Sequence, residues 1–188
     1  MKTLYVIAGA NGSGKTTFAR KYCAAKDIPF LNADDIAAEY QRGGFGTRNL
    51  AAGKELLRHL SGYVHSGKTV AFETTLSGLA YARRLNEAKG MGYRIVLFYL
   101  FVDSPDVSIE RIQGRVKAGG HYIPDEVVRT RTRKSICNFF RVYETLADLW
   151  FMYYNGGMEP LKVAEKLGSV SQVFDTRRYE MLKVRCEK

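Results

Sequence analysis

The stretch Gly9-Ala10-Asn11-Gly12-Ser13-Gly14-Lys15-Thr16 fits the pattern G-x-x-x-x-G-K-[ST] without a gap. It follows a short apolar run at residues 3–8 and precedes a segment of helical character, so it joins a strand to a helix. Glycines let the backbone wrap closely around phosphate oxygens, and the N–H groups at the start of the helix then face the anion. The stretch therefore predicts a phosphate-binding loop, or P-loop.

The residue types of this loop predict individual roles. Lys15 is expected to reach the β- and γ-phosphates of ATP, and the hydroxyl of Thr16 is expected to ligate Mg²⁺. A P-loop predicts nucleotide binding but not the reaction, because GTPases, motor ATPases and small-molecule kinases share it. The predicted ATP-binding residues are Gly9, Ala10, Asn11, Gly12, Ser13, Gly14, Lys15, Thr16 and Thr17.

Strand-like and helical patterns alternate along the chain. They predict an α/β fold of the P-loop NTPase type, with a mostly parallel, doubly wound sheet and helices on both faces, as one domain over residues 1–188. The last strands are expected to pair antiparallel because their connections are too short for crossovers. Residues 42–47 carry three glycines and predict a loop. The predicted strands are 3–8, 28–32, 68–72, 93–102 and 149–154, and helices are expected near 15–25, 34–41 and 77–89, after Ser104 and after Pro124.

Composition excludes several classes of protein. Hydrophobic residues make up 46% of the 188 positions and charged residues 26%, as in folded globular chains. The longest apolar run, residues 95–102, is too short to span a bilayer, and the N-terminus has no cleavage-site pattern, so no membrane partner is expected. Cys23, Cys137 and Cys186 are odd in number and far apart, which predicts free thiols in a reducing compartment and a cytoplasmic location.

The net charge of +10 is unevenly distributed. Residues 111–141 hold eight Lys or Arg and two Asp or Glu. Such a run is most often a solvated helix face. It is also compatible with a clamp for the phosphates of a small ligand or with a nucleic-acid surface. The neighbouring P-loop favours the clamp.

Acidic residues follow three of the predicted strands, at the sheet edge where ligands of open parallel sheets bind. Asp34 is predicted to orient the acceptor hydroxyl and take its proton, although it could also cap the following helix. Glu73 is predicted to hold a substrate hydroxyl or a metal-bound water, with Thr74 beside it in the substrate site. Asp103 is expected to be a helix N-cap before Pro105.

Arginines are predicted to stabilise the moving phosphoryl group, because a planar guanidinium suits its charge and geometry. Arg111 and Arg115 lie four residues apart and therefore on one helix face. The following Gly119-Gly120-His121 predicts a flexible exit, so this Arg-rich helix is expected to act as a lid over ATP. Arg131 on the next helix is a further candidate for the substrate site, as is His121.

With these motifs in place, the chain resembles the zeta-toxin-like P-loop kinases, in particular their short stand-alone members. The resemblance implies Mg²⁺-dependent transfer of the γ-phosphate of ATP to a hydroxyl, which in the best-known toxins belongs to UDP-N-acetylglucosamine. It also implies Lys15 on ATP, Asp34 as base, Glu73 at the substrate, lid arginines on the phosphate, and an antitoxin as a candidate partner. The resemblance runs through residues 9–17, 32–34 and 72–78, Glu110-Arg111-Ile112, Arg115-Val116, Gly119-Gly120-His121-Tyr122-Ile123-Pro124 and the helix at 129–138.

Two other functions stay open. A pI of about 9.6, with Tyr122 and Phe139 near the basic stretch, is compatible with a polynucleotide kinase or a nucleic-acid-associated P-loop ATPase. Nucleic acid is the less favoured partner, because the basic residues cluster beside the predicted lid and do not form a separate strip with stacking aromatics. A nucleotide-gated switch would need no acceptor base, and Asp34 argues against it.

Overall fold

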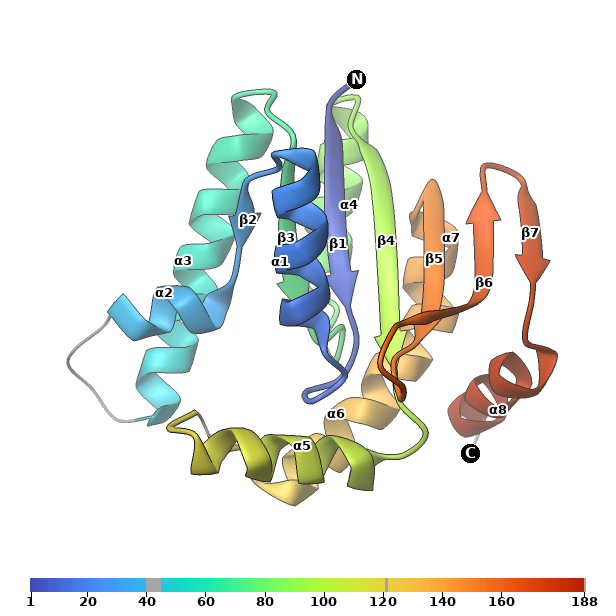
Figure 1. The fold of residues 1–188 in the computed structure, drawn as a ribbon. Coiled ribbons are helices and arrows are strands. Elements are labelled where there is room, and N and C mark those ends of the chain that lie inside the picture. Colours follow the sequence, from blue (N-terminus) through green and yellow to red (C-terminus); the bar gives the residue numbers. More distant parts are fainter. Residues whose placement is uncertain (40–44, 121, 188) are drawn as a thin grey trace.

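The computed structural model describes residues 1–39, 45–120 and 122–187. Its strands form a seven-stranded sheet in the order β2-β3-β1-β4-β5-β6-β7 (Figure 1). The first five strands pair in parallel, whereas β6 and β7 are antiparallel, as predicted. The strands are β1 (Thr3–Ala8), β2 (Phe30–Leu31), β3 (Val70–Thr74), β4 (Arg94–Phe101), β5 (Leu149–Tyr154), β6 (Leu161–Leu167) and β7 (Val170–Val173).

Helices cover both faces of the sheet, which confirms the predicted α/β architecture. Side chains of β1 alternate between two cores, as the period of a strand requires. Leu4 and Val6 pack with α3 and α4 on one face, and Ile7 packs with α1 on the other. The helices are α1 (Lys15–Lys26), α2 (Ala33–Glu39), α3 (Phe45–His65), α4 (Ala80–Gly90), α5 (Pro105–Lys117), α6 (Asp125–Asn138), α7 (Glu144–Leu146) and α8 (Thr176–Glu187).

Helix α5 crosses below the carboxyl ends of the central strands and so lies over the edge where the P-loop emerges (Figure 1). Ser104 caps it by accepting a hydrogen bond from the N–H of Val107, and Pro105 occupies its first turn. At its other end the N–H groups of Gly119 and Gly120 donate to Val116 and Arg115. This is a Schellman motif, so the two glycines that were predicted as a flexible exit form an ordered helix stop.

Several predicted boundaries differ from the structure. Strand β2 is limited to Phe30–Leu31, and β3 runs to Thr74 and therefore includes Glu73. The predicted loop at 42–47 is wrong in its second half, because α3 begins at Phe45, while residues 42–44 lie outside the described part of the chain.

Helix α6 continues into a five-residue π-helical turn, Phe139–Tyr143. The apolar residues of this segment share one face: Ile136, Phe139 and Tyr143 are buried in the larger core, and Phe140 packs against it. All three cysteines are free, as predicted. Within the described ranges, no helix is long and apolar enough to cross a membrane.

Candidate functional site

The P-loop occupies the turn between β1 and α1. Gly9 adopts φ of +139°, and a Cβ atom at this position would lie 2.1 Å from the carbonyl oxygen of Leu100. Only glycine satisfies both conditions, so the loop can fold closely over the end of β4. The motif therefore lies where the sequence predicted, between a central strand and a helix.

Lys15 is a buried cation with a neutral partner. It is 7% exposed, and its Nζ donates a 2.9 Å hydrogen bond to the carbonyl of Ala10. Burial lowers the pKa of Lys15, whereas the carboxylates of Glu73 and Asp34 raise it. An ammonium group buried in a P-loop in this way suits an anionic ligand. A phosphate would supply the negative charge that compensates the ammonium group for its lost contact with solvent.

A cavity of about 620 Å³ opens in front of the P-loop. It combines the loop with acidic residues from α2 and β3 and with cationic residues from α1 and α5. Its size and its ring of N–H donors and cations suit a nucleoside triphosphate. Its lining residues include Asn11, Gly12, Gly14, Lys15, Thr16, Thr17, Arg20, Asn32, Asp34, Asp35, Glu73, Arg111, Arg115, Asn155 and Gly157.

A second cavity of about 430 Å³ adjoins the first. The two cavities share six lining residues, which form a common wall. A ligand in one cavity would therefore lie next to a ligand in the other. On its far side the second cavity is lined by Thr74, Thr75, Ser77 and Tyr81 and by residues of α6 and the segment before it. The shared wall consists of Asn11, Lys15, Asn32, Asp34, Glu73 and Arg115.

Thr16 and Glu73 meet inside the first cavity. The hydroxyl of Thr16 donates a 2.8 Å hydrogen bond to Oε2 of Glu73. Burial raises the pKa of Glu73, and Asp34 and Asp35 raise it further, while Lys15 and the Thr16 bond oppose the shift. A hydroxyl and carboxylates on one wall form the oxygen donor set that Mg²⁺ prefers, so these residues fit a magnesium ion carried by a triphosphate.

Asp34 lies in the first turn of α2 and lines both cavities. Its own N–H donates a 2.7 Å hydrogen bond to Oδ1 of Asn32, so Asn32 is the cap of this helix. The alternative that Asp34 serves as the N-cap is therefore wrong, and its carboxylate faces the cavities. The next residue, Asp35, pairs with Arg20 of α1 at 2.7 Å.

The structure brings all three predicted arginines to the cavities. Arg111 lines the first cavity, Arg115 lines both, and Arg131 lines the second. Arg131 also donates a 3.2 Å hydrogen bond to Oδ1 of Asn11 in the P-loop. Thr74, which was predicted for the substrate site, lines the second cavity, whereas His121 lies outside the described residues.

Asp103, the acidic residue that follows β4, does not have the role predicted for it. It is not the N-cap of α5, because Ser104 is. Its carboxylate instead accepts a hydrogen bond from the hydroxyl of Tyr154, and it lines neither cavity. The third acidic side chain at the phosphate cavity is Asp35, since α2 turns both Asp34 and Asp35 toward the edge.

Asn155, which was assigned no role from the sequence, also lines the first cavity. It belongs in addition to a third cavity of about 480 Å³ beside Gly14 and Thr17. This third cavity is largely apolar, and its lining includes Phe18, Tyr22, Tyr153, Met158 and Pro160.

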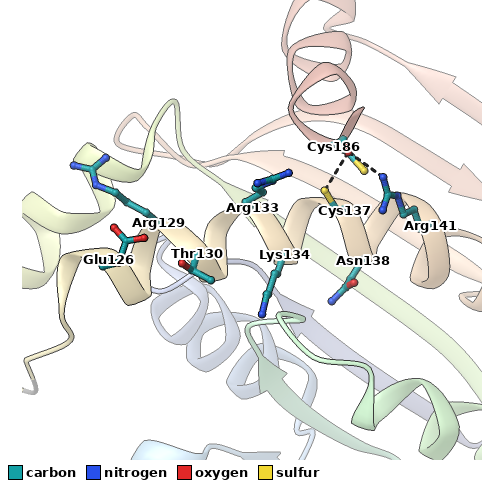
Figure 2. A pocket seen from close by; sticks show the side chains of 9 residues that line it. All are labelled: Glu126, Arg129, Thr130, Arg133, Lys134, Cys137, Asn138, Arg141 and Cys186. Atoms are coloured by element: carbon teal, nitrogen blue, oxygen red, sulfur yellow. Dashed lines mark hydrogen bonds between the residues drawn. The ribbon is translucent and has the colours of Figure 1, made fainter. Parts of the chain in front are cut away.

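The rest of the basic stretch lies apart from the P-loop. Arg129, Arg133 and Lys134 lie along α6, and Arg141 lies in the π-helical turn that follows, next to Cys186 of α8 (Figure 2). These four residues line a shallow cavity of about 570 Å³. Arg129 is paired with Asp106 at 2.6 Å, and Arg141 donates to the carbonyl of Cys186 at 3.1 Å. The charge run is therefore divided between the edge that carries the P-loop and a second surface.

Two known proteins are similar in sequence. An uncharacterized protein of Haemophilus influenzae is 32% identical over 125 residues, which are 65% of this chain and 87% of that protein. An adenylate kinase of Campylobacter fetus subsp. fetus is 28% identical over 137 residues, which are 70% of this chain and 66% of that protein.

A solved structure from the PezAT chromosomal toxin–antitoxin system of Streptococcus pneumoniae has the same fold. The superposition has a TM-score of 0.68 with 15% sequence identity, and it covers 100% of this chain and 86% of that one. At the level of families, the profile of the AAA domain family matches residues 4–135, which include the P-loop, Asp34, Glu73 and the three arginines. The chain belongs to the AAA domain family.

Proposed function

We propose that the protein is a kinase that transfers the γ-phosphate of ATP to a hydroxyl group of a small molecule. One observation carries the proposal: two adjoining cavities share a wall that contains Lys15, Asp34, Glu73 and Arg115. A nucleotide hydrolase needs room for a water molecule beside the γ-phosphate, whereas a second cavity of about 430 Å³ has room for an organic acceptor.

The residues of the first cavity would bind ATP. The P-loop N–H groups and Lys15 would hold the phosphates, and the base would enter the apolar cavity lined by Phe18, Met158 and Pro160. Thr16, with Glu73 beside it, would hold Mg²⁺, which when bound neutralises charge on the β- and γ-phosphates. The similarity to an adenylate kinase supports ATP as the phosphate donor.

The residues of the shared wall would carry out the transfer. Asp34 would accept a hydrogen bond from the acceptor hydroxyl, align it for in-line attack and take its proton late. Arg115, which touches both cavities, would stabilise charge that develops on the moving phosphoryl group, with Arg111 on the donor side and Arg131 on the acceptor side. The position of Arg111 and Arg115 at the cavities also supports the proposal that α5 acts as a lid over ATP.

The acceptor cavity favours a polyhydroxylated molecule. Thr74, Thr75 and Ser77 supply hydroxyls, Tyr81 supplies an aromatic face, and Arg131 supplies a positive charge. A sugar nucleotide related to UDP-N-acetylglucosamine combines these features, as the resemblance to zeta-toxin-like kinases implies. The fold shared with a toxin–antitoxin system makes an antitoxin a candidate partner.

A second candidate is a polynucleotide kinase. The observation that favours it is the basic surface along α6, where Arg133 and Lys134 are exposed (Figure 2). A nucleic-acid strand could lie on this surface with its terminal hydroxyl at Asp34. No aromatic side chain lines the surface among the described residues, so bases would have no stacking platform there.

One screen tests both candidates. The protein and Mg·ATP are incubated with UDP-sugars, nucleosides, small alcohols and an oligonucleotide with a 5′-hydroxyl, and products are detected by their added phosphate mass. We expect a small-molecule acceptor to be phosphorylated by the wild type and not by Lys15→Ala. Phosphorylation of the oligonucleotide alone would favour the second candidate, and release of inorganic phosphate with every acceptor would contradict both.

A further inference from the structure

Asn155 connects the end of the sheet to the P-loop. It follows the last residue of β5, and its N–H donates a 2.8 Å hydrogen bond to the carbonyl of Phe101 at the end of β4. Its position is therefore fixed by two parallel strands of the core. From there its side-chain Nδ2 donates a 2.8 Å hydrogen bond to the carbonyl oxygen of Ser13.

The Ser13 carbonyl is part of what shapes the P-loop. A loop that directs its N–H groups at an anion directs its carbonyl groups the other way, and these buried carbonyls need donors. Ser13 is 1% exposed, so water has little access to it. The Asn155 amide satisfies this carbonyl from outside the loop and thereby favours the orientation in which the N–H groups face the cavity.

Gly14 shows how closely the amide lies against the loop. A Cβ atom at Gly14 would be 2.1 Å from Nδ2 of Asn155, and the residue has φ of +87°. Both facts require glycine here. Gly14 is also the N-cap of α1, directly before Lys15 and Thr16, so its conformation sets the direction of the N–H groups that begin the helix.

We propose that Asn155 is a positioning residue that holds the P-loop in its phosphate-binding conformation. This inference rests on one part of the proposed function, namely that the P-loop binds ATP. Asn155 lines the phosphate cavity and the apolar cavity, and so lies between the sites proposed for the phosphates and the base. Without it, part of the binding free energy would be spent on ordering the loop, which weakens the phosphate contacts.

Binding of ATP and of AMP separates this role from a merely structural one. Asn155→Ala removes the donor, and Asn155→Asp keeps the shape but cannot donate to the Ser13 carbonyl. We expect both variants to bind Mg·ATP about 10-fold more weakly while AMP affinity changes by less than about twofold, because AMP lacks the β- and γ-phosphates that the loop holds. A general loss of structure would weaken both nucleotides equally.

Asn138→Ala is the matched control. Its Nδ2 donates a 2.6 Å hydrogen bond to the carbonyl of Leu76, a bond of the same kind made to a different loop. This variant should keep the wild-type preference for ATP over AMP. Wild-type preference in both Asn155 variants would overturn the inference and leave the proposed function intact. A wild-type protein that binds ATP in this way but phosphorylates no acceptor would overturn the proposed function and leave the inference intact.

Discussion

The hydroxyl of Thr16 and the carboxylate of Glu73 are joined by a 2.8 Å hydrogen bond across the phosphate cavity, although 57 residues separate them in the chain. The bond exists because β1 and β3 are parallel neighbours in the sheet, with Ile7 opposite Glu73. The P-loop that follows β1 therefore starts α1 beside the end of β3. Thr16 belongs to the loop that is proposed to bind ATP, and the bond places it beside Glu73, with which it is proposed to hold Mg²⁺.

Replacement of Thr16 tests that connection. Thr16→Val keeps the branched shape but loses the hydroxyl proposed to ligate Mg²⁺. We expect the Mg²⁺ concentration for half-maximal ATP turnover to rise about 10- to 100-fold. Thr17→Val, one residue further and exposed at the same cavity, should leave the Mg²⁺ requirement unchanged. Equal Mg²⁺ titration curves for wild type and Thr16→Val would show that the hydroxyl does not bind the metal.

The raised pKa of Glu73 predicts a pH-dependent effect on stability. Below the ordinary carboxyl pKa of 4.5 the group is protonated in both the folded and the unfolded chain. As the pH rises through the higher folded pKa, the buried carboxylate must ionise against its desolvation, and stability is lost. Glu73→Gln removes this loss, so without ligands its Tm should match the wild type near pH 4 and exceed it by about 2–4 °C at pH 7.

Glu126→Gln provides the comparison for that measurement, because Glu126 is exposed on α6. Its Tm should follow the wild type across the same pH range. If Glu73→Gln is less stable than the wild type at pH 7, then the contacts of Glu73 with Lys15 and Thr16 outweigh its desolvation, and the predicted sign is wrong.

Arg115 is predicted to act in the transition state. Arg115→Ala should lower kcat about 100-fold while the affinity for ATP changes by no more than a few fold, since the guanidinium acts mainly on charge that develops during transfer. Arg129→Ala, an arginine of α6 that lines neither cavity, should keep kcat and serves as the control. A proportional fall in ATP affinity with unchanged kcat would instead make Arg115 a ground-state contact.

Substitutions at Asn32 and at Asp34 are predicted to differ in their effect on stability. Because Asn32 caps α2, Asn32→Ala should lower the free energy of unfolding by about 1 kcal/mol, or Tm by about 2–4 °C. Asp34→Ala should lower Tm by less than 1 °C or so, since an exposed side chain without a capping bond contributes little. Thermal unfolding of the two variants decides the assignment, and a larger loss in Asp34→Ala would reverse it.

The sequence predicted what depends on local pattern. The P-loop is contiguous, and the strand before it is a continuous apolar run, so the fold and the position of Lys15 followed directly. The caps did not follow, because they depend on the residue at which a strand ends. Strand β2 ends at Leu31, so Asn32 caps α2, and β4 ends at Phe101, so Ser104 caps α5.

Tertiary contacts account for the remaining differences. Asn155 acts on Ser13 across 142 residues, and no spacing or motif in a single sequence predicts such a contact. The basic run from 111 to 141 reads as one feature in the sequence, but the fold divides it between two surfaces.

The ratio of phosphorylated organic product to inorganic phosphate tests the central claim most directly. It is measured with Mg·ATP and the acceptor found by the screen, for the wild type and Asp34→Asn, which keeps the shape of the side chain but loses its charge. We predict that the wild type forms mainly the organic product. We also predict that Asp34→Asn forms it about 10²- to 10⁴-fold more slowly, with ATP affinity within about twofold. Unchanged product formation in Asp34→Asn, or inorganic phosphate as the main product of the wild type, would contradict the account.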